Sequence, residues 1–185
     1  MKKAVFIFGI LLLAIAACQK KMEYPIEPQI AYKGFTYLIN EDSTFSGQGI
    51  LSFSYADGDG DLGLDVSDSL PPFNSSSPYY YNLIIDYQKL ENGTFHSVPL
   101  LSWNMETQSF DTVSFNARFK RLYAGNESKP ISGNMDYTLF VQNPFSPNDT
   151  VRFAVKIIDR ALHESNVIFT ETLYTNPRLI NNEKY

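Results

Sequence analysis

The sequence predicts an all-β fold, a sandwich of two antiparallel sheets of the immunoglobulin or fibronectin type with about seven or eight strands. Three observations favour this fold. Aromatic residues make up 15% of the chain, with 14 Phe and 12 Tyr, and aromatic side chains favour strands. Apolar and polar residues alternate in short segments, and turn residues separate these segments. No segment keeps a helical period over three turns.

Eight segments show the alternation expected of strands. In the second of them, Leu51, Phe53 and Tyr55 alternate with serines, and the third ends at the turn signal Asn92–Gly93. In chain order the predicted strands are 30–39, 49–56, 79–90, 94–101, 109–123, 135–141, 151–158 and 167–174. A closed barrel is the main alternative to the sandwich.

The first residues have the pattern of an export signal. Lys2 and Lys3 precede an apolar run that is shorter than the roughly 20 residues of a membrane-spanning helix. The run ends in Ile-Ala-Ala-Cys, which resembles the lipobox of bacterial lipoproteins. We therefore expect cleavage before Cys18 and a lipid anchor on its thiol. An ordinary signal peptide with a chance cysteine is the alternative.

Three parts follow from this interpretation: a signal peptide (1–17), the lipidated cysteine with an extended tether (18–29), and one β-sandwich domain (30–185). Two or more acyl chains hold a protein stably on a membrane. Cys18 is the only cysteine of the chain, so no disulfide is expected within the domain.

The charge of the chain excludes one class of partner. The formal net charge is −5, and it falls to −7 when Lys2 and Lys3 are removed with the signal peptide. An acidic protein repels phosphate backbones and gains nothing from counterion release. We therefore expect no nucleic-acid partner.

The segment 57–61 alternates three aspartates with two glycines. Calcium takes about six to eight oxygen ligands, and glycines let the backbone curl so that nearby carboxylates meet. The segment resembles an EF-hand loop, but Leu62 stands where that loop has glycine, and strand and loop segments flank it. A Ca²⁺ loop between strands fits better, and a solvated acidic turn is the alternative. The predicted ligands in this loop are Asp57, Asp59, Asp61, Gly63 through its carbonyl, Asp65 and Asp68.

Asp159 follows the seventh predicted strand. In an immunoglobulin-like topology, the loop after the second strand and the loop before the last strand share one end of the sandwich. We therefore expect Asp159 to join the calcium ligands from across the sheets. The alternative is that Asp159 and Arg160 merely form a turn.

The sequence predicts a protein that is not an enzyme. His96 and His163 lack the spacing of a zinc site, and no nucleophile elbow or phosphate-binding glycine loop is present. Loops on a rigid sandwich commonly bind ligands, so Tyr79, Tyr80 and Tyr81, after the long connection 64–78, are candidate binding residues. Packing on a sheet face is their alternative role. Trp103 is expected in the core.

The lipobox, the proline-containing tether, and the segments FSYADGDGDLG and IIDRALHESN together resemble uncharacterised lipoproteins of Bacteroidetes-type bacteria. The resemblance implies a cell-envelope protein with an immunoglobulin-like or cadherin-like domain, lipid-anchored to the outer membrane on its periplasmic or its outer face. We expect a non-catalytic binding or structural module whose partner is a glycan, a peptide or an outer-membrane protein. An accessory subunit of an uptake or envelope assembly is the alternative, and a carbohydrate-active enzyme is a third hypothesis.

Overall fold

The computed structural model describes residues 23–42, 44–125, 127–141 and 149–176. The predicted signal peptide, Cys18 and the first part of the predicted tether lie outside these residues. Across the described ranges the chain forms ten strands. The same ranges contain no helix that is long and apolar enough to cross a membrane.

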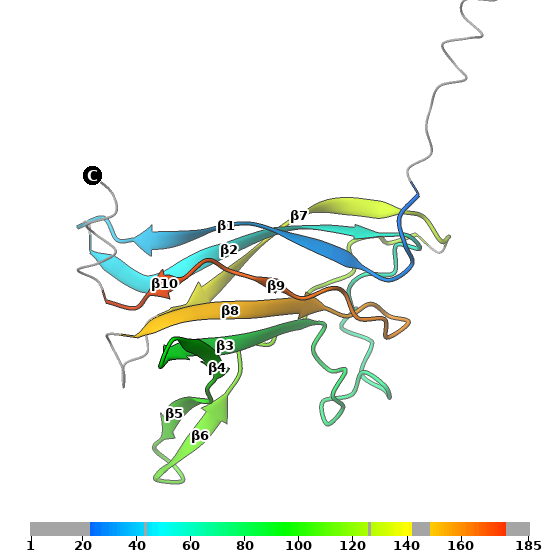
Figure 1. Ribbon diagram of the computed structural model, residues 1–185. Coiled ribbons are helices and arrows are strands. Elements are labelled where there is room, and N and C mark those ends of the chain that lie inside the picture. Colours follow the sequence, from blue (N-terminus) through cyan, green and yellow to red (C-terminus); the bar gives the residue numbers. More distant parts are fainter. Residues whose placement is uncertain (1–22, 43, 126, 142–148, 177–185) are drawn as a thin grey trace, which may run out of the picture.

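Two antiparallel sheets lie face to face (Figure 1). The first has the order β1 (Gln29–Ile39), β2 (Phe45–Asp57), β7 (Ile131–Phe140). The second has the order β10 (Leu173–Tyr174), β8 (Thr150–Ile157), β3 (Leu83–Glu91), β4 (Thr94–Ser97), and β9 (Ile168–Phe169) also pairs with β8. This order of strands is that of an immunoglobulin or fibronectin-type sandwich. The predicted fold class is confirmed, and the strands of the described residues do not close into a barrel.

Alternating side chains build the core between the sheets. Phe153 of β8 is fully buried and lies at its centre, stacked on Phe35 of β1 at 6.2 Å between ring centroids. Tyr87 and Phe115 meet the Phe153 ring edge-on at 5.6 Å and 5.4 Å. Burial of a side chain of this size stabilises a fold by about 1.5–3 kcal/mol. The shared core therefore fixes β2 and β8, and the loops that follow both strands, relative to each other.

Several predicted strand limits are wrong. The third strand begins at Leu83 rather than at residue 79, and the predicted strand 109–123 ends at Val113. The predicted strand 94–101 is split between β4 and β5 (Leu100–Asn104), where Pro99 has no N–H for a ladder. The last predicted strand is divided into β9 and β10. Between them the Thr170 hydroxyl accepts the Phe153 N–H at 3.0 Å, and it thus replaces a backbone partner.

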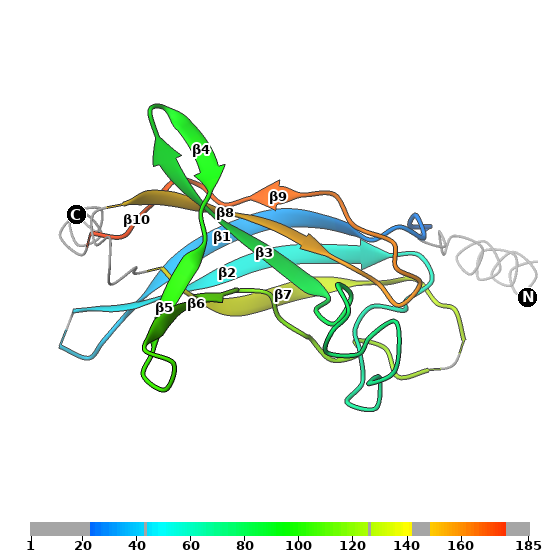
Figure 2. The same cartoon turned by 90° about the horizontal axis from the view of Figure 1, so that it is seen from below.

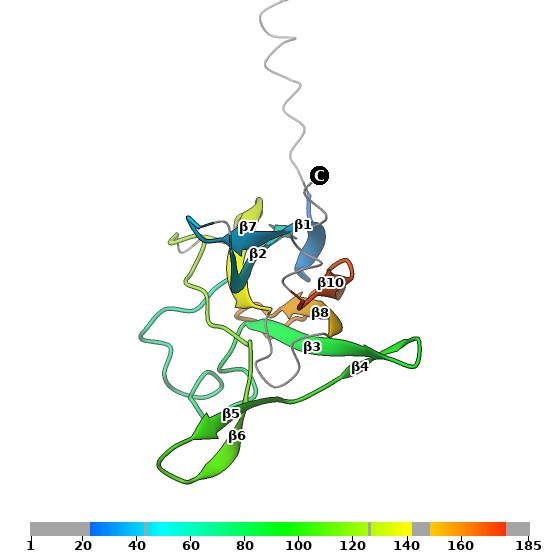
Figure 3. The same ribbon diagram turned by 90° about the vertical axis from the view of Figure 1, so that its left-hand side faces the viewer.

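Trp103 is not in the core, contrary to the expectation. It lies on β5, which pairs with β6 (Ser109–Val113) in a separate hairpin that projects from the sandwich (Figure 3). Trp103 is 46% exposed and meets Phe110 edge-on at 5.0 Å. Alternation alone does not reveal this, because a projecting hairpin and a core strand show the same period.

Candidate metal centre

Three aspartates of the acidic loop converge where β2 ends. One carboxylate oxygen from each of Asp57, Asp59 and Asp61 lies within 4.8 Å of the other two. Asp57 closes β2 and is fully buried, whereas Asp59 and Asp61 are half-buried. Figure 2 shows that the loop after β2, the loop after β8 and the start of the described chain gather at the same end of the sandwich. The cluster is a group that could hold a metal ion.

Four carboxylate oxygens of this cluster lack hydrogen-bond partners among the described residues. Both oxygens of Asp57, one of Asp59 and one of Asp61 are buried without a partner among the described residues. A buried polar group left unsatisfied costs about 1–3 kcal/mol, and more if it is charged. Buried charges in proteins are normally paired or coordinate a metal. The cluster therefore has the chemistry of a cation site.

Burial and crowding raise the pKa values of these groups. Burial, followed by the nearby charges of Asp59, Asp61 and Asp159, raises the pKa of Asp57 to about 7, while the Asp61 backbone N–H opposes this shift. Burial and the charge of Asp159 raise the pKa of Asp61 to about 6. A divalent cation among these carboxylates would replace their repulsion by attraction.

The loop after β8 brings Asp159 beside the cluster. Its side chain is completely buried; Oδ1 accepts the His163 N–H at 2.7 Å, and Oδ2 lies 2.8 Å from Nδ1 of the same histidine. In the same loop the Ala161 N–H donates to Asp61 Oδ2 at 3.0 Å. The two loops thus meet at the end of the sandwich where Asp159 was expected, and its role as a metal ligand stays a prediction.

Glycines let the acidic loop pack closely. Gly60 has a φ of +75°, and a Cβ there would lie 2.1 Å from the carbonyl oxygen of Lys129. A Cβ on Gly63, with a φ of +96°, would lie 2.3 Å from the carbonyl oxygen of Lys120. Larger residues would push the loop away from the segment 120–129. The proposed carbonyl ligand at Gly63 stays a prediction.

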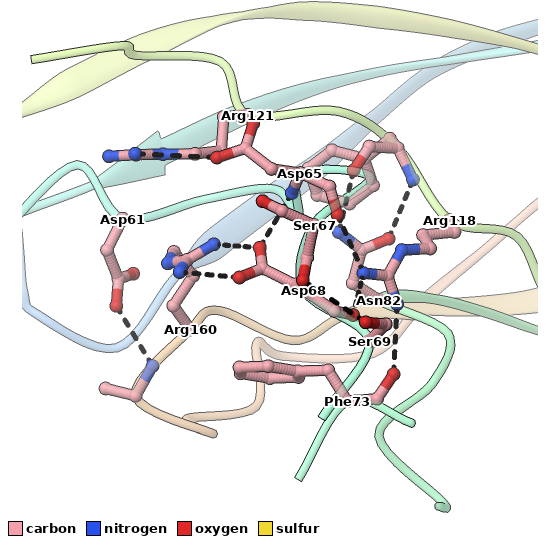
Figure 4. A network of polar contacts seen from close by, with 12 residues as sticks. Asp61, Asp65, Ser67, Asp68, Ser69, Phe73, Asn82, Arg118, Arg121 and Arg160 are labelled. Carbon is pink, nitrogen blue, oxygen red and sulfur yellow. Dashed lines mark hydrogen bonds and ion pairs between the residues drawn. The ribbon is translucent and has the colours of Figure 1, made fainter. Parts of the chain in front are cut away.

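Asp65 and Asp68, two of the predicted ligands, do not join the cluster. Both carboxylate oxygens of Asp68 bind the Arg160 guanidinium, with Oδ1 at 3.1 Å from Nη2. The carboxylate of Asp65 lies 3.7 Å from Arg121 Nη1. Figure 4 shows both pairs, each joined by dashed lines. Because an arginine neutralises each of them, we assign neither residue to the metal centre.

Arg118 is a residue that sequence reasoning missed. Its guanidinium donates to four backbone carbonyls of the connection between β2 and β3 (Figure 4). These belong to Asp65 at 2.9 Å, Asp68 at 2.5 Å, Phe73 at 3.2 Å and Tyr80 at 3.1 Å. A single arginine in a segment that alternates like a strand gives no local signal of this role. Arg118 holds the long connection in one shape beside the acidic loop.

Tyr79, Tyr80 and Tyr81 lie in the connection before β3 and not on a strand. Arg118 lies over the Tyr80 ring at 5.3 Å, and Tyr80 meets Tyr81 edge-on at 4.9 Å. Tyr80 therefore packs within the arginine network, while Tyr81 is 37% exposed. Their role in ligand binding stays a prediction.

Comparison of the chain with protein-family models, with curated proteins and with solved structures finds no match. The functional argument therefore depends on the residues of the site.

Proposed function

We propose that this chain is a lipid-anchored protein of the cell envelope, without catalytic activity, whose sandwich binds one Ca²⁺ ion in the acidic loop and presents the surrounding loops to a ligand. The observation that carries the proposal is Asp57. It is fully buried, neither of its oxygens has a hydrogen-bond partner among the described residues, and it faces Asp59 and Asp61. A bound cation would satisfy all three side chains at once.

The donor atoms favour calcium over other metals. The cluster offers only carboxylate oxygens, which suit Ca²⁺, whereas zinc prefers nitrogen and sulfur ligands. Mg²⁺ requires a nearly ideal octahedron and usually keeps several waters. Ca²⁺ accepts irregular geometry, which suits ligands that come from a glycine-rich loop.

Isothermal titration calorimetry of the purified protein tests the metal part of the proposal. We expect one Ca²⁺ per chain, because the described residues bring together one group of three aspartates. Mg²⁺ at the same concentration should compete weakly. Absence of binding heat at millimolar Ca²⁺, at two temperatures, would mean that the aspartate cluster is not a calcium site.

Substitution of Cys18 tests the lipid anchor. Cys18 is the only thiol of the chain, so Cys18→Ser should abolish incorporation of radiolabelled palmitate and leave the precursor unmodified. Gln19→Ser is the matched control, because it changes the next residue of the chain and keeps the thiol, and it should be labelled like the unaltered protein. Equal labelling of both variants would exclude lipidation at Cys18.

The surroundings of His163 support a non-catalytic role. The Asp159–His163 pair has the form of a base and its orienting acid, but a catalytic dyad also needs a nucleophile within reach. The neighbouring Ser165 hydroxyl donates to the Asn166 carbonyl at 2.8 Å and accepts the Ile157 N–H at 3.0 Å. Ser165 therefore serves the backbone of the loop and is not directed at His163.

A second candidate function, an accessory subunit of an envelope assembly, is favoured by the projecting hairpin. Trp103 pairs directly with Phe110 across the two strands, so both rings lie on one face together with Leu101. All three are at least 45% exposed. An isolated two-stranded hairpin is only marginally stable in water, and an exposed apolar patch often marks a protein contact.

The double variant Trp103→Ser, Phe110→Ser tests this candidate. If the hairpin contacts an outer-membrane protein, the variant should elute from size-exclusion chromatography of membrane extracts at the size of the single chain, while the unaltered protein elutes in a larger complex. Val66→Ser with Leu70→Ser, two exposed apolar residues elsewhere, is the control. Identical elution of all three proteins would exclude the assembly role of the hairpin.

A further inference from the structure

A polar pocket of about 400 Å³ opens directly beside the aspartate cluster. Asp59 and Asp61 belong both to the cluster and to the pocket wall. The wall also includes Arg121, Tyr123, Glu127 and Arg160. In Figure 4 the side chains of Arg121 and Arg160 extend toward the side of the site where Asp61 lies. An ion held by the cluster would therefore face this pocket.

The carboxylates leave part of a calcium shell open. Ca²⁺ takes about six to eight oxygen ligands, whereas the three aspartates provide four buried oxygens without partners among the described residues. The oxygens of Asp159 are already engaged with His163. The remaining positions of the ion must be filled by backbone carbonyls, by water or by a ligand, and the pocket is the side from which water or a ligand can enter.

The charges of the pocket wall select a neutral ligand. With Ca²⁺ bound, the ion and the guanidinium groups of Arg121 and Arg160 carry four positive charges, which balance the four carboxylates of Asp57, Asp59, Asp61 and Glu127. Both arginines also face Asp65 or Asp68. An anionic ligand would add an unbalanced charge to this site and would meet the formal net charge of −5 on the chain. A hydroxyl group suits the wall better, because it donates to a carboxylate, accepts from a guanidinium and coordinates Ca²⁺ through its oxygen.

Arg121 and Tyr123 provide the two remaining features of such a site. Arg121 Nε is buried without a hydrogen-bond partner among the described residues, and its Nη2 donates to the Gly125 carbonyl at 3.2 Å, which holds the guanidinium at the pocket. Tyr123 adds an aromatic surface to an otherwise polar wall, and aromatic rings pack well on the apolar faces of sugars.

We propose that this pocket binds a neutral sugar, two adjacent hydroxyl groups of which complete the calcium shell. This inference depends on the proposed Ca²⁺ site, and it specifies the class of ligand that binds at the same end of the sandwich. Asp59 and Glu127 accept hydrogen bonds from the sugar hydroxyls, Arg121 donates one, and Tyr123 contacts the ring. A peptide finds few apolar contacts on this wall, since Tyr123 is its main apolar surface.

Saturation-transfer difference NMR on the purified protein tests the proposal. The probes are the methyl α-glycosides of mannose, glucose, galactose and fucose, each with millimolar Ca²⁺ and again with EDTA. At least one glycoside should give a signal that EDTA removes. With Eu³⁺ in place of Ca²⁺, luminescence lifetimes in H₂O and D₂O count the waters on the ion, and the bound sugar should displace about two of them.

Two variants separate the sugar from the ion. Arg121→Gln and Tyr123→Ala should each weaken glycoside binding by roughly tenfold or more while calorimetry still shows one Ca²⁺ per chain. Phe140→Ala, which removes an exposed aromatic ring outside the pocket wall, should leave the glycoside signal unchanged.

The outcomes distinguish this inference from the proposed function. Normal Ca²⁺ binding without a signal from any of the four glycosides overturns the sugar site and leaves the calcium site standing. A glycoside signal that survives EDTA, or that both pocket variants retain, also overturns it. If the protein binds no Ca²⁺, both the calcium site and the sugar site are wrong.

Discussion

Asp57→Asn should make this protein more stable than the unaltered protein without calcium and less stable than it with calcium. Without metal, the substitution replaces a buried carboxylate that has no hydrogen-bond partner among the described residues by a neutral group of the same shape. It also relieves the repulsion from Asp59, Asp61 and Asp159 that raises the pKa of Asp57. The variant should therefore unfold at a higher temperature than the unaltered protein in EDTA.

With calcium present the order of the two proteins should change. A ligand that binds only the folded state stabilises it by about 2.7 kcal/mol at a hundredfold excess over its Kd, which corresponds to roughly 5–10 °C for a domain of this size. The unaltered protein should gain this increment, and Asp57→Asn should gain little of it. Thermal unfolding in EDTA and in millimolar Ca²⁺ measures both effects.

Asp111→Asn is the matched control for this experiment. Asp111 lies on the exposed hairpin and accepts a hydrogen bond from Asn104 at 2.7 Å, so its substitution should leave the calcium increment intact. If Asp57→Asn is less stable than the unaltered protein in EDTA, Asp57 stabilises the metal-free fold by itself. The argument from its unsatisfied oxygens would then be wrong.

The second large effect is a loss of stability as the pH rises in the absence of metal. The pKa values of Asp57 and Asp61 are about 7 and about 6 in the folded protein, against 3.8 as the ordinary value of an aspartate. The folded state therefore binds more protons than the unfolded state between these values. The stabilisation is fully present below pH 3.8 and is lost as the pH rises through 6 and 7.

Each unit of pKa difference corresponds to about 1.4 kcal/mol, so the part of the loss that falls between pH 5 and pH 8 should be a few kcal/mol for the pair. The raised pKa of His163 beside Asp159 acts in the same direction. In EDTA we expect the midpoint of thermal unfolding to be several degrees higher at pH 5 than at pH 8. Saturating Ca²⁺ should remove most of this difference, because the ion binds the ionised carboxylates.

Asp57→Asn also serves as the internal control for the pH dependence. It removes the group with the pKa of about 7, and it should flatten the fall in stability between pH 5 and pH 8 in EDTA. A midpoint in the metal-free, unaltered protein that rises over this interval would show that the aspartates are not crowded in solution.

Much of the fold could be predicted because its signal is local. Leu51 and Phe53, like Val151 and Phe153, are two residues apart with a polar residue between them, as expected of a strand with one buried face. The same local pattern misplaced the limits of the segment 109–123 and the position of Trp103. The limits of the segment depend on whether a partner strand exists, and the position of Trp103 depends on whether a second sheet covers the hairpin. Alternation reports neither.

The chemistry of the site could be predicted from the sequence: aspartates at alternate positions, glycines between them, and an acidic residue after the strand that becomes β8. The lipobox and the lipid anchor on Cys18 are also inferred from the local sequence, and they stay predictions. Which carboxylates meet depends on the packing of the folded chain. Asp68 looked equivalent to Asp61 in the sequence, but it binds Arg160, which is 92 residues away. Arg118 reaches the Asp65 carbonyl across 53 residues. The packing of the sheets brings such distant side chains together, and no pattern within one segment of the chain encodes that meeting.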